Sequence, residues 1–374
     1  MRIALIGPAH PYKGGGARHT TELAHRLTAA GHDVIIESWR AQYPARLYPG
    51  QQTIDTPEGE PYPRTHRRLA WYRPDGWFAA GCRLRTADLV IFALLTPLQI
   101  PAYLVIRAGL FGPNRPRTTV ICHNVLPHER RPGDVALIRT LLKHVDTVIT
   151  HSTAQAVQAR DLVPGVQVVT ARMPPHLPKH HWAERPDVPP PRHVPAGSGG
   201  AWCRLLFFGI VRPYKGLDVL LRALAQAPAH LTLTVAGEFW GGTAETEKLI
   251  AELGLADRVT LRPGYLPAAE LPALFAAADA LVMPYREATA SQNAVLAFAH
   301  GVPVITTTAG ALADLVRDGV DGLTCAPGDA GDLARALAAI SVPETLTALR
   351  SGVRAFDPEP GWADYLRALV RPAG

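Results

Sequence analysis

Short apolar runs alternate with amphipathic segments along almost the whole chain. In segment 17–30, Leu23, Leu27 and Ala30 recur at spacings of four and three and Gly31 follows, a pattern that predicts a helix. The apolar runs are rich in Val and Ile and lack polar alternation, so they predict strands buried on both faces of a parallel sheet. The predicted strands are 2–7, 33–39, 88–94, 118–124, 146–152, 166–171, 204–209, 231–237, 259–265, 278–285 and 303–307.

The alternation is interrupted at residues 183–201, where proline, glycine and charged residues replace the periodic pattern. This composition predicts a linker. A chain of 374 residues is also longer than one hydrophobic core usually serves. We therefore expect an α/β protein of two doubly wound, Rossmann-like domains, 1–182 and 202–357, that face each other across a cleft. Ligands of such sheets bind beyond the carboxyl ends of the strands, so residues that directly follow a strand are the candidates for a site.

Composition narrows the class of partner. Hydrophobic residues make up 47% of the chain and charged residues 19%, as in globular rather than disordered proteins. The formal net charge of +6 favours anionic partners such as nucleotides, phosphorylated lipids or acidic membranes. Aromatic residues account for 7% and the basic residues are scattered, so a nucleic-acid groove has little support. Arg64, Arg67 and Arg68 suit an acidic membrane or a lipid phosphate, although a solvated face is the simpler interpretation.

Cysteine usage and apolar segments indicate a cytoplasmic protein. The four cysteines lie far apart and match no metal or redox motif, which suits free thiols in a reducing compartment. The apolar run at the N-terminus is shorter than that of a signal peptide. The best membrane candidate, 94–110, is interrupted by Pro97 and Pro101 and carries Gln99 and Arg107, so it predicts a buried or membrane-facing helix rather than a span. The expected location is the cytoplasm, either free or peripheral at the inner face of the membrane.

The strongest candidates for chemistry follow the strand 204–209. Arg212 and Lys215 stand three residues apart between this strand and the next predicted helix. An arginine fork and a lysine point charge beside a helix N-terminus can hold both phosphates of a diphosphate without a divalent metal. A solvated basic turn is the common alternative, but the place directly after a strand favours a functional role.

In the first domain the candidates are a glycine loop and a histidine. Gly14, Gly15 and Gly16 directly precede a predicted helix, where they would let the backbone approach an anion. Their spacing does not match the dinucleotide fingerprint, and a flexible surface loop explains them equally well. His123 ends a strand, where an imidazole can bond a sugar hydroxyl or exchange a proton near neutral pH. It ranks above the nearby His128, and a core histidine with satisfied hydrogen bonds is the alternative for both.

The segment 283–305 offers a second helix start that could bind an anion. Ser291 is a suitable N-cap for a helix over 291–300. The backbone N–H groups that this helix would present to a ligand belong to Gln292, Asn293 and Ala294. An ordinary helix cap is the alternative.

Two further residues at strand ends are weaker candidates. Glu238 can accept hydrogen bonds from sugar hydroxyls, and Tyr265 can help to form a base pocket. His180 and His181 have neither cysteine nor a carboxylate cluster nearby, so we expect no metal site. The chain also lacks a glycosidase-type carboxylate pair, a nucleophile elbow and a P-loop.

Together these segments resemble the retaining GT-B glycosyltransferases of the group 1 type, glycosyltransferase family 4. The resemblance is carried by FFGIVRPYKGLDVLLRAL, by VAGE, by RVTLRPGY with the segment as far as MPY, by AHGVPVITTTAGALADLVRDGVDGL and by the glycine loop. It covers essentially the whole second domain and, more loosely, the first. Residues 358–371 resemble the closing helix of this family, which returns to the first domain; that domain would then comprise 1–182 with about 358–374.

The resemblance assigns roles to the candidates named above. It implies that Arg212 and Lys215 hold the donor diphosphate, that Gly15 and Gly16 lie over the phosphates, and that His123 contacts the transferred sugar. The implied activity is transfer of a hexose-type sugar from a nucleotide-diphosphate sugar to an acceptor hydroxyl, with retention of configuration and without a metal or other cofactor. Fixed cations would stabilise the charge that grows on the leaving phosphate.

One segment departs from the family pattern. Two glutamates separated by seven residues are usual there; aligned on Pro284 and Gly301, they fall on Ala288 and Leu296, and Glu287 is adjacent to the first position. The second glutamate holds the nucleotide ribose in relatives, so ribose binding must differ here. Two alternatives therefore stay open: a non-catalytic binding or scaffold protein on the same fold, and a nucleotide-sugar epimerase or hydrolase. The retained glycine loop and basic turn favour an active transferase, whose base, sugar and acceptor (glycan, lipid-linked or small molecule) the sequence does not name.

Overall fold

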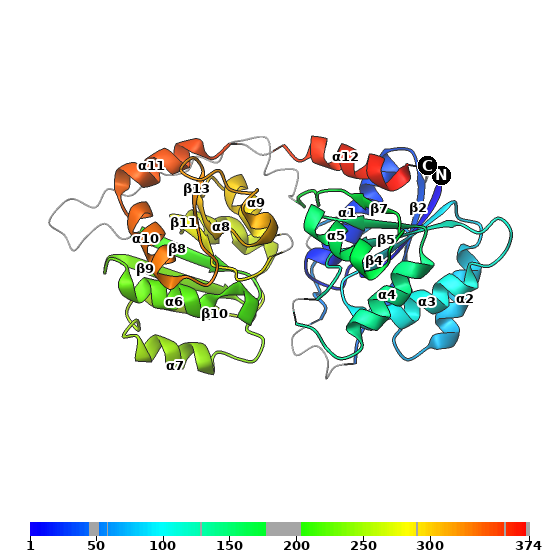
Figure 1. Cartoon of the computed structure of the whole chain (residues 1–374), viewed down its shortest axis with the longest axis horizontal. Helices are drawn as coiled ribbons and strands as arrows, with labels where there is room; N and C mark the ends of the chain where they lie inside the picture. The colour runs from blue at the N-terminus through cyan, green and yellow to red at the C-terminus, as the bar shows by residue number, and fades with distance from the viewer. Residues whose placement is uncertain are drawn as a thin grey trace. The chain divides into compact units, whose positions relative to one another are not determined.

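The computed structural model describes residues 1–44, 52–57, 59–127, 129–176, 203–288, 291–354 and 357–371. The chain divides into two compact units, one of Met1–His176 with Pro358–Gly374 and one of Leu177–Asp357 (Figure 1). Each unit contains a parallel sheet with helices against it, which confirms the predicted α/β class. The predicted linker 183–201 lies outside the described residues, as do His128, His180 and His181.

The first unit is built on a seven-stranded sheet in the order β3-β2-β1-β4-β5-β6-β7, with all neighbouring strands parallel. Its strands are β1 (Arg2–Ile6), β2 (Asp33–Ala41), β3 (Thr65–Ala70), β4 (Leu89–Leu94), β5 (Arg117–Cys122), β6 (Thr147–Thr150) and β7 (Val168–Thr170). The central strand β4 is buried at every residue, as expected of a strand that is covered on both faces.

The edge strand β3 was not predicted from the sequence. Its residues read THRRLA, so it lacks the apolar run by which the other strands were recognised. An edge strand tolerates such residues because part of it faces solvent. The basic residues of this segment have partners within the unit: Arg64 pairs with Asp33, Arg67 donates to the carbonyl oxygen of His10, and Arg68 pairs with the buried Glu37.

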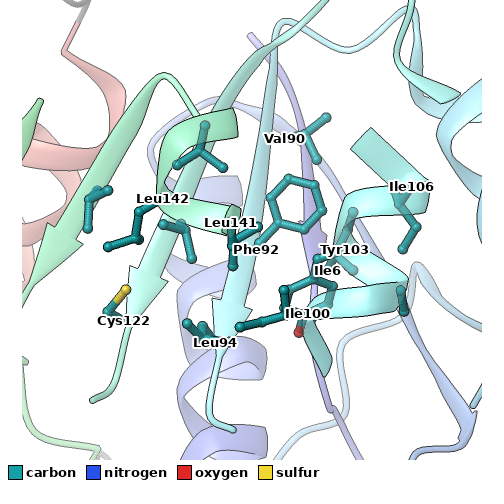
Figure 2. Close-up of a cluster of buried hydrophobic side chains, with 14 of the residues drawn as sticks. Ile6, Val90, Phe92, Leu94, Ile100, Tyr103, Ile106, Cys122, Leu141 and Leu142 are labelled. Carbon is teal, nitrogen blue, oxygen red and sulfur yellow. The ribbon is translucent and has the colours of Figure 1, made fainter. Parts of the chain in front are cut away.

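The helices of the first unit cover two separate cores. They are α1 (Gly15–Ala29), α2 (Pro74–Leu84), α3 (Ile100–Gly109), α4 (Asp134–His144), α5 (Thr153–Leu162) and α12 (Glu359–Val370). Side chains of β1 alternate between the two faces of the sheet: Ala4 and Ile6 join one core, whereas Ile3 and Leu5 join the core shared with α1 and α12. Figure 2 shows the first of these cores, in which Phe92 of β4 packs among side chains of α3 and α4.

The apolar segment 94–110 forms a buried helix. After the short 3-10 helix Pro97–Gln99, α3 places Ile100, Tyr103 and Ile106 in the core of the unit. Of the two interpretations of this segment, the structure supports the buried helix. Of the residues described, none belongs to a helix with the length and apolarity needed to span a bilayer.

The second unit repeats the plan with a six-stranded parallel sheet in the order β10-β9-β8-β11-β12-β13. Its strands are β8 (Cys203–Phe208), β9 (Leu231–Gly237), β10 (Val259–Pro263), β11 (Ala280–Met283), β12 (Val304–Thr307) and β13 (Gly322–Cys325). Its helices are α6 (Leu217–Gln226), α7 (Ala244–Glu252), α8 (Leu271–Ala276), α9 (Asn293–Ala299), α10 (Ala330–Ile340) and α11 (Pro343–Gly352). β13 and α11 were not predicted, since β13 has only four residues, GLTC, and two of them are polar or small.

In both sheets the strand order reverses beside the first strand. The reversal lies between β1 and β4 in the first unit and between β8 and β11 in the second. Two strands flank each reversal, and the connections that follow them run in opposite directions along the sheet. A crevice therefore forms at the carboxyl ends of these two strands. The residues that follow β1, β4, β8 and β11 are thus the ones placed to bind a ligand.

The helices α2 and α3 contact each other backbone to backbone. A Cβ added at Gly81 of α2 would lie 2.1 Å from the carbonyl oxygen of Ile106 and 2.8 Å from the Cα of Gly109, both in α3. No side chain fits at that distance, so glycine is required there for packing rather than for an unusual backbone angle.

We expect Gly81→Ala to lower the free energy of unfolding by about 3 kcal/mol, because α2 and α3 must move apart to admit the methyl group. Urea unfolding followed by circular dichroism measures the loss. Gly76→Ala is the matched control in the same helix: its Cβ would meet only the Cβ of Arg73 at 3.6 Å, so alanine should be neutral or slightly stabilising. Equal stability of the two variants would contradict the required close contact.

Candidate functional site

The basic turn of the second unit lies at the reversal of strand order. Arg212 is in extended conformation after β8, Lys215 ends the 3-10 helix Pro213–Lys215, and α6 follows directly. Residues beyond β11 hold this turn in place. The guanidinium of Arg286 binds both carboxylate oxygens of Asp218 at 2.6 and 2.8 Å, and its backbone N–H donates to the carbonyl oxygen of Tyr214 at 2.8 Å. The guanidinium beside Asp218 lowers the pKa of that carboxyl group below its usual value.

The side chains of Lys215 and Asn293 meet beside Gly209, the first residue after β8. A Cβ at Gly209 would lie 3.2 Å from Lys215 Nζ and 3.2 Å from Asn293 Nδ2. Gly209 has a φ of +109°, which side-chain-bearing residues rarely adopt. Asn293 is fixed by the hydrogen bond that its Nδ2 donates to the carbonyl oxygen of Phe208 at 2.7 Å. The structure thus places two N–H donors around one small open position at the carboxyl end of β8.

The charge of Lys215 is not balanced by a carboxylate within the described part of the chain. Its Nζ lies 5.3 Å from the centre of the Tyr285 ring. Burial lowers the pKa of its ammonium group; the nearby Tyr214 raises it in part, and the charge of Arg212 lowers it further. Arg212 itself lies over the ring of Trp240, with Cζ 4.2 Å from the ring centre. An anion bound here would offset the electrostatic repulsion between the two neighbouring cations.

The segment after β11 differs in detail from the prediction. The helix α9 begins at Asn293 rather than at Ser291, and Gln292 occupies the cap position. Ser291 still accepts a hydrogen bond from the backbone N–H of Asn293 at 3.3 Å, so it closes the turn before the helix. Ala294 is completely buried in the core of the unit. Because α9 has only seven residues, we attribute the binding potential of this segment mainly to the Asn293 side chain.

Glu238 and Tyr265 follow the next two strands along the same edge. The carbonyl oxygen of Glu238 accepts from the N–H of Val211 at 2.8 Å, so Glu238 continues β9 alongside the basic turn. Tyr265 follows β10, the outermost strand, with β9 between it and β8. At about 4.8 Å per strand this sets Tyr265 roughly 10 Å from the turn. Glu238 therefore lies beside the start of the basic turn, and Tyr265 lies farther along the edge.

In the first unit, the glycine loop is partly open and partly packed. The helix α1 begins at Gly15, two residues earlier than predicted, with Gly14 as its cap residue. A Cβ at Gly15 would have nothing within 4 Å, whereas a Cβ at Gly16 would overlap Leu95, which follows β4, at 2.6 Å. Gly15 thus leaves the first turn of α1 accessible, while packing alone explains the glycine at position 16.

His123 follows β5 next to the same reversal point. Its backbone N–H donates to the carbonyl oxygen of Leu94 at 3.1 Å, and its carbonyl oxygen accepts from Gln155 Nε2 at 3.3 Å. The ring is half-buried, and its Nε2 is buried without a hydrogen-bond partner among the residues described. Both backbone contacts fix His123 at the carboxyl edge of the sheet, where a ligand is expected.

Comparison with known families assigns both units. The family model described as Glycosyltransferase Family 4 matches residues 13–171, and the model described as Glycosyl transferases group 1 matches residues 203–341. The two matches cover most of both sheets and every candidate residue named above. The chain belongs to the group 1 glycosyltransferases. Its match to this family confirms the resemblance on which the sequence-based roles were built.

Individual relatives agree with this family. D-inositol 3-phosphate glycosyltransferase 1 from Catenulispora acidiphila is 35% identical over 185 residues, which are 45% of this chain and 44% of that protein. The matched part therefore spans less than half the length of this relative.

Solved structures establish the fold. Sucrose-phosphate synthase from Thermosynechococcus elongatus superposes with a TM-score of 0.74 at 21% identity over 98% of both chains. HepE from Anabaena in complex with UDP and glucose gives 0.72 at 16% identity over 99% of both. These likenesses confirm the predicted GT-B fold.

The two positions where the family carries glutamates are apolar and packed. Ala288 and Leu296 both lie against the hydrophobic core that surrounds β11 and α8, and Glu287 is exposed beside them. The carbonyl oxygen of Ala288 would lie 1.9 Å from a Cβ at Gly310, so this backbone is also tightly enclosed. The chain therefore differs from its family in packing as well as in charge at this segment.

Sequence analysis missed a cluster of histidines behind His123. The ring centres of His19 and His123 are 5.1 Å apart, those of His123 and His151 5.5 Å, and those of His19 and His176 4.8 Å. His19 comes from α1, whose apolar stripe gave no reason to single it out. His151 ends a predicted strand as His123 does, and this shared position was the available signal. The other missed residues are the Trp240 and Tyr285 rings beside the basic turn.

Burial keeps all four histidines neutral. It lowers the pKa of His151 to about 4 and that of His176 to about 3, and it lowers the pKa of His19 and His123 well below 6.5. The other histidines of the cluster add to the effect at His19 and His123, and Arg18 adds to it at His176, whereas the carbonyl oxygen of Ala171 opposes it at His151. Among the described residues, no group of three or more His, Cys, Asp or Glu side chains is arranged to hold a metal ion.

The histidine cluster predicts that the first unit loses stability in acid. Unfolded histidines bind protons below about pH 6.5, whereas the folded cluster does not until about pH 4 or lower, so stability falls as the pH drops through this window. We expect each cluster histidine to contribute a slope of up to about 1.4 kcal/mol per pH unit. Amide hydrogen exchange of the strands of each unit, measured between pH 7 and 4.5 and corrected for the intrinsic exchange rate, tests this.

Two variants serve as probe and control for this acid effect. His151→Asn should reduce the dependence of the first unit's stability on pH by the contribution of one histidine. His144 is an exposed residue of the same unit, so His144→Gln should leave this dependence unchanged. A first unit whose stability is constant over this pH range would show that the cluster is not neutral.

Proposed function

We propose that this protein transfers a sugar from a nucleotide-diphosphate donor to a hydroxyl group of an acceptor. The observation that carries the proposal is the half-buried ammonium group of Lys215, which shares its turn with Arg212 and has no carboxylate partner in the described chain. Two cations at the carboxyl edge of a doubly wound sheet suit an anion with two phosphates. Membership of the group 1 family and the UDP and glucose bound by HepE support the same assignment.

In this proposal the second unit binds the donor. Lys215 and Arg212 hold the diphosphate, and the Asn293 amide donates to a phosphate or sugar oxygen beside Gly209. Because these charges are fixed in place, they can stabilise the leaving phosphate as the anomeric C–O bond breaks, without a divalent metal. Backbone N–H groups of Ser291–Ala294 remain secondary candidates, and Glu238 is positioned for a sugar hydroxyl.

The first unit is assigned to the acceptor and the transferred sugar. A neutral imidazole at His123 can donate or accept one hydrogen bond to a sugar hydroxyl without adding a charge. The open first turn of α1 at Gly15 is a second candidate for contact with phosphate, and Gly16 is needed to form it. We infer retention of configuration with a hexose-type sugar, in which the departing phosphate takes the proton of the acceptor hydroxyl.

Ribose binding must follow a different route from that of the family. Ala288 and Leu296 offer no carboxylate, and both pack into the core. The exposed Glu287 is adjacent and is the nearest candidate for the ribose hydroxyls, with Tyr265 on the outer strand for the base. These packed apolar residues are also the specific observation in favour of a second candidate function, a binding or scaffold protein that holds a nucleotide without transferring a sugar.

We expect Lys215→Ala and Arg212→Ala each to weaken diphosphate binding by at least tenfold and to lower turnover by two orders of magnitude or so, because each removes a fixed cation from the leaving group. Calorimetric titration with UDP, GDP, ADP and TDP in EDTA measures binding and identifies the base. Arg222→Ala, an exposed residue of α6, is the charge-matched control and should change neither.

Each outcome of these titrations distinguishes the candidates. Metal-free binding that disappears in Lys215→Ala supports the phosphate site. Binding without sugar transfer across a broad panel of donors and acceptors would move the scaffold function ahead, and sugar release without any acceptor would favour a hydrolase. Unchanged binding in both variants would show that the basic turn is not the phosphate site.

We also propose that one face of the first unit contacts an anionic membrane peripherally. Phe78 of α2 and Phe111 stack with ring centres 6.4 Å apart and are 45% and 54% exposed. The guanidinium of Arg85 lies 4.6 Å from the Phe111 ring. Trp71 and Tyr72, directly before α2, are exposed as well. Exposed aromatic rings with a neighbouring arginine suit the boundary between lipid headgroups and acyl chains.

Replacement of both stacked rings, Phe78→Ser with Phe111→Ser, should abolish most co-sedimentation with phosphatidylglycerol vesicles, and phosphatidylcholine vesicles should bind the unaltered protein weakly. Val157→Ser on α5 removes an equally exposed apolar side chain elsewhere on the same unit and should have no effect. Binding that survives the double substitution would place the contact elsewhere or exclude it.

A further inference from the structure

His19 is the centre of a buried hydrogen-bonded chain in the first unit. Its side chain is completely buried. Its Nδ1 lies 3.0 Å from Nε2 of His176, and its Nε2 lies 3.1 Å from the hydroxyl of Tyr365 on α12. Both ring nitrogens are thus committed, and a neutral ring satisfies both contacts by donating at one and accepting at the other. The ring of His19 cannot turn without losing a hydrogen bond in the interior of the unit.

The residues hydrogen-bonded to His19 lie next to the two points where the polypeptide leaves and re-enters the first unit. His176 is the last residue of the first unit before one passage, and α12 begins directly after the other. Trp362 of α12 donates from Nε1 to the carbonyl oxygen of Pro175 at 3.1 Å. Arg18 of α1 donates to the carbonyl oxygen of His176 at 2.9 Å. Residues far apart in sequence are therefore bonded to one another around His19.

His123 packs against this fixed ring. The planes of His19 and His123 are perpendicular, with centres 5.1 Å apart, and His151 covers His123 from a distance of 5.5 Å. His151 is itself fixed, because its Nδ1 contacts the carbonyl oxygen of Ala171 at 3.1 Å. The orientation of His123 therefore depends on the rings behind it as well as on its own backbone hydrogen bonds.

Among the described residues, the carboxylates near the cluster are paired with a cation. The groups that face His19 are His123, His151, His176 and Tyr365, and the cations Arg18 and Arg26 of α1 act on His176. The carboxylates in reach, Glu22 and Glu359, are both paired with Arg26. Cys122, close to Tyr365, is a buried thiol whose pKa is raised by burial to about 12, so it adds no negative charge at neutral pH.

We propose that His19, held between His176 and Tyr365, is a positioning residue for His123: it orients the His123 ring and shields it from water, so that the sugar site keeps an uncharged imidazole in acid where an exposed histidine is charged. The proposal rests on the proposed function only in naming the sugar as the ligand of His123. The orientation and neutrality of the ring are properties of the unit itself and are measurable without a substrate.

The test removes one anchor of His19 and follows His123. Tyr365→Phe deletes the hydroxyl group that contacts His19 and keeps the ring that packs in the core. Tyr62→Phe is the matched control: Tyr62 is also buried in the first unit, and its hydroxyl donates to the carbonyl oxygen of Val34 at 3.0 Å. The histidine that its ring contacts is His25, which is not a member of the cluster. If the Tyr365 hydroxyl only stabilised the fold, the two variants should have the same effect on the His123 ring.

The readout is the NMR titration of the His123 ring proton, assigned by its loss in His123→Gln. In the unaltered protein and in Tyr62→Phe this signal should not titrate between pH 8 and 5. In Tyr365→Phe the pKa should move towards 6.5 by about one unit or more, as the loosened ring admits water. His19→Gln, as a second variant, should give at least the same shift. Titration of His123 near pH 6.5 in the unaltered protein, or identical behaviour of Tyr365→Phe and Tyr62→Phe, would overturn the proposal.

Activity separates the two proposals. If the protein transfers a sugar, kcat/KM at pH 5.5 relative to pH 7.5 should fall by about fivefold or more in Tyr365→Phe compared with Tyr62→Phe, because a charged His123 replaces a neutral one. Absence of turnover in every form, together with the expected NMR shifts, would reject the proposed transferase and leave the positioning role of His19 in place. A normal acid profile in Tyr365→Phe despite the NMR shift would show that His123 does not serve the sugar.

Discussion

The reversal of strand order beside the first strand of each sheet is the constraint on which the candidate sites depend. Parallel strands need crossover connections, and where the order reverses the connections on either side leave the carboxyl edge uncovered. In the second unit this edge receives the basic turn after β8 and the clamp of Arg286 on Asp218 after β11. In the first unit it receives the start of α1 and His123. In each unit the residues that meet at this edge come from segments far apart in sequence, and the sheet brings those segments together.

The two sites differ in their electrostatics. In the second unit, burial and the nearby charge of Arg212 lower the pKa of Lys215, so its charged form is disfavoured until an anion binds. In the first unit, burial has the opposite consequence for function, since it removes charge from His123 and its neighbours. In the proposed function, the first of these sites would bind phosphate and the second neutral hydroxyl groups. Such a division suits a reaction in which negative charge develops on the leaving group while the sugar is held by hydrogen bonds alone.

How far the sequence could predict this protein depended on how local each signal was. Strands of continuous Val and Ile were found because burial on both faces of the sheet requires several adjacent apolar residues. β3 was missed because its residues THRRLA contain no apolar run, and β13 because it has only four residues. Arg212 and Lys215 stood together after a strand and were identified. His19 and His176 were not, because the fold alone brings them together, and the position of His151 at the end of a predicted strand was overlooked.

The departure at Ala288 and Leu296 is best understood through packing. Had the chain merely lost two carboxylates, their positions would face solvent or the ligand and could hold any small residue. Instead both side chains join the core around β11 and α8, and the backbone at Ala288 closes against Gly310. Reintroducing a glutamate at position 296 would therefore place a carboxylate in a partly buried, apolar environment, which is unfavourable unless a partner is supplied. Asn293, one helical turn before Leu296, is fixed by its hydrogen bond to Phe208, so the proposed phosphate contacts do not require a charge from this segment. The change is thus confined to the half of the site that would meet the nucleoside, and donor selectivity rather than phosphate binding is where this protein should differ from its relatives.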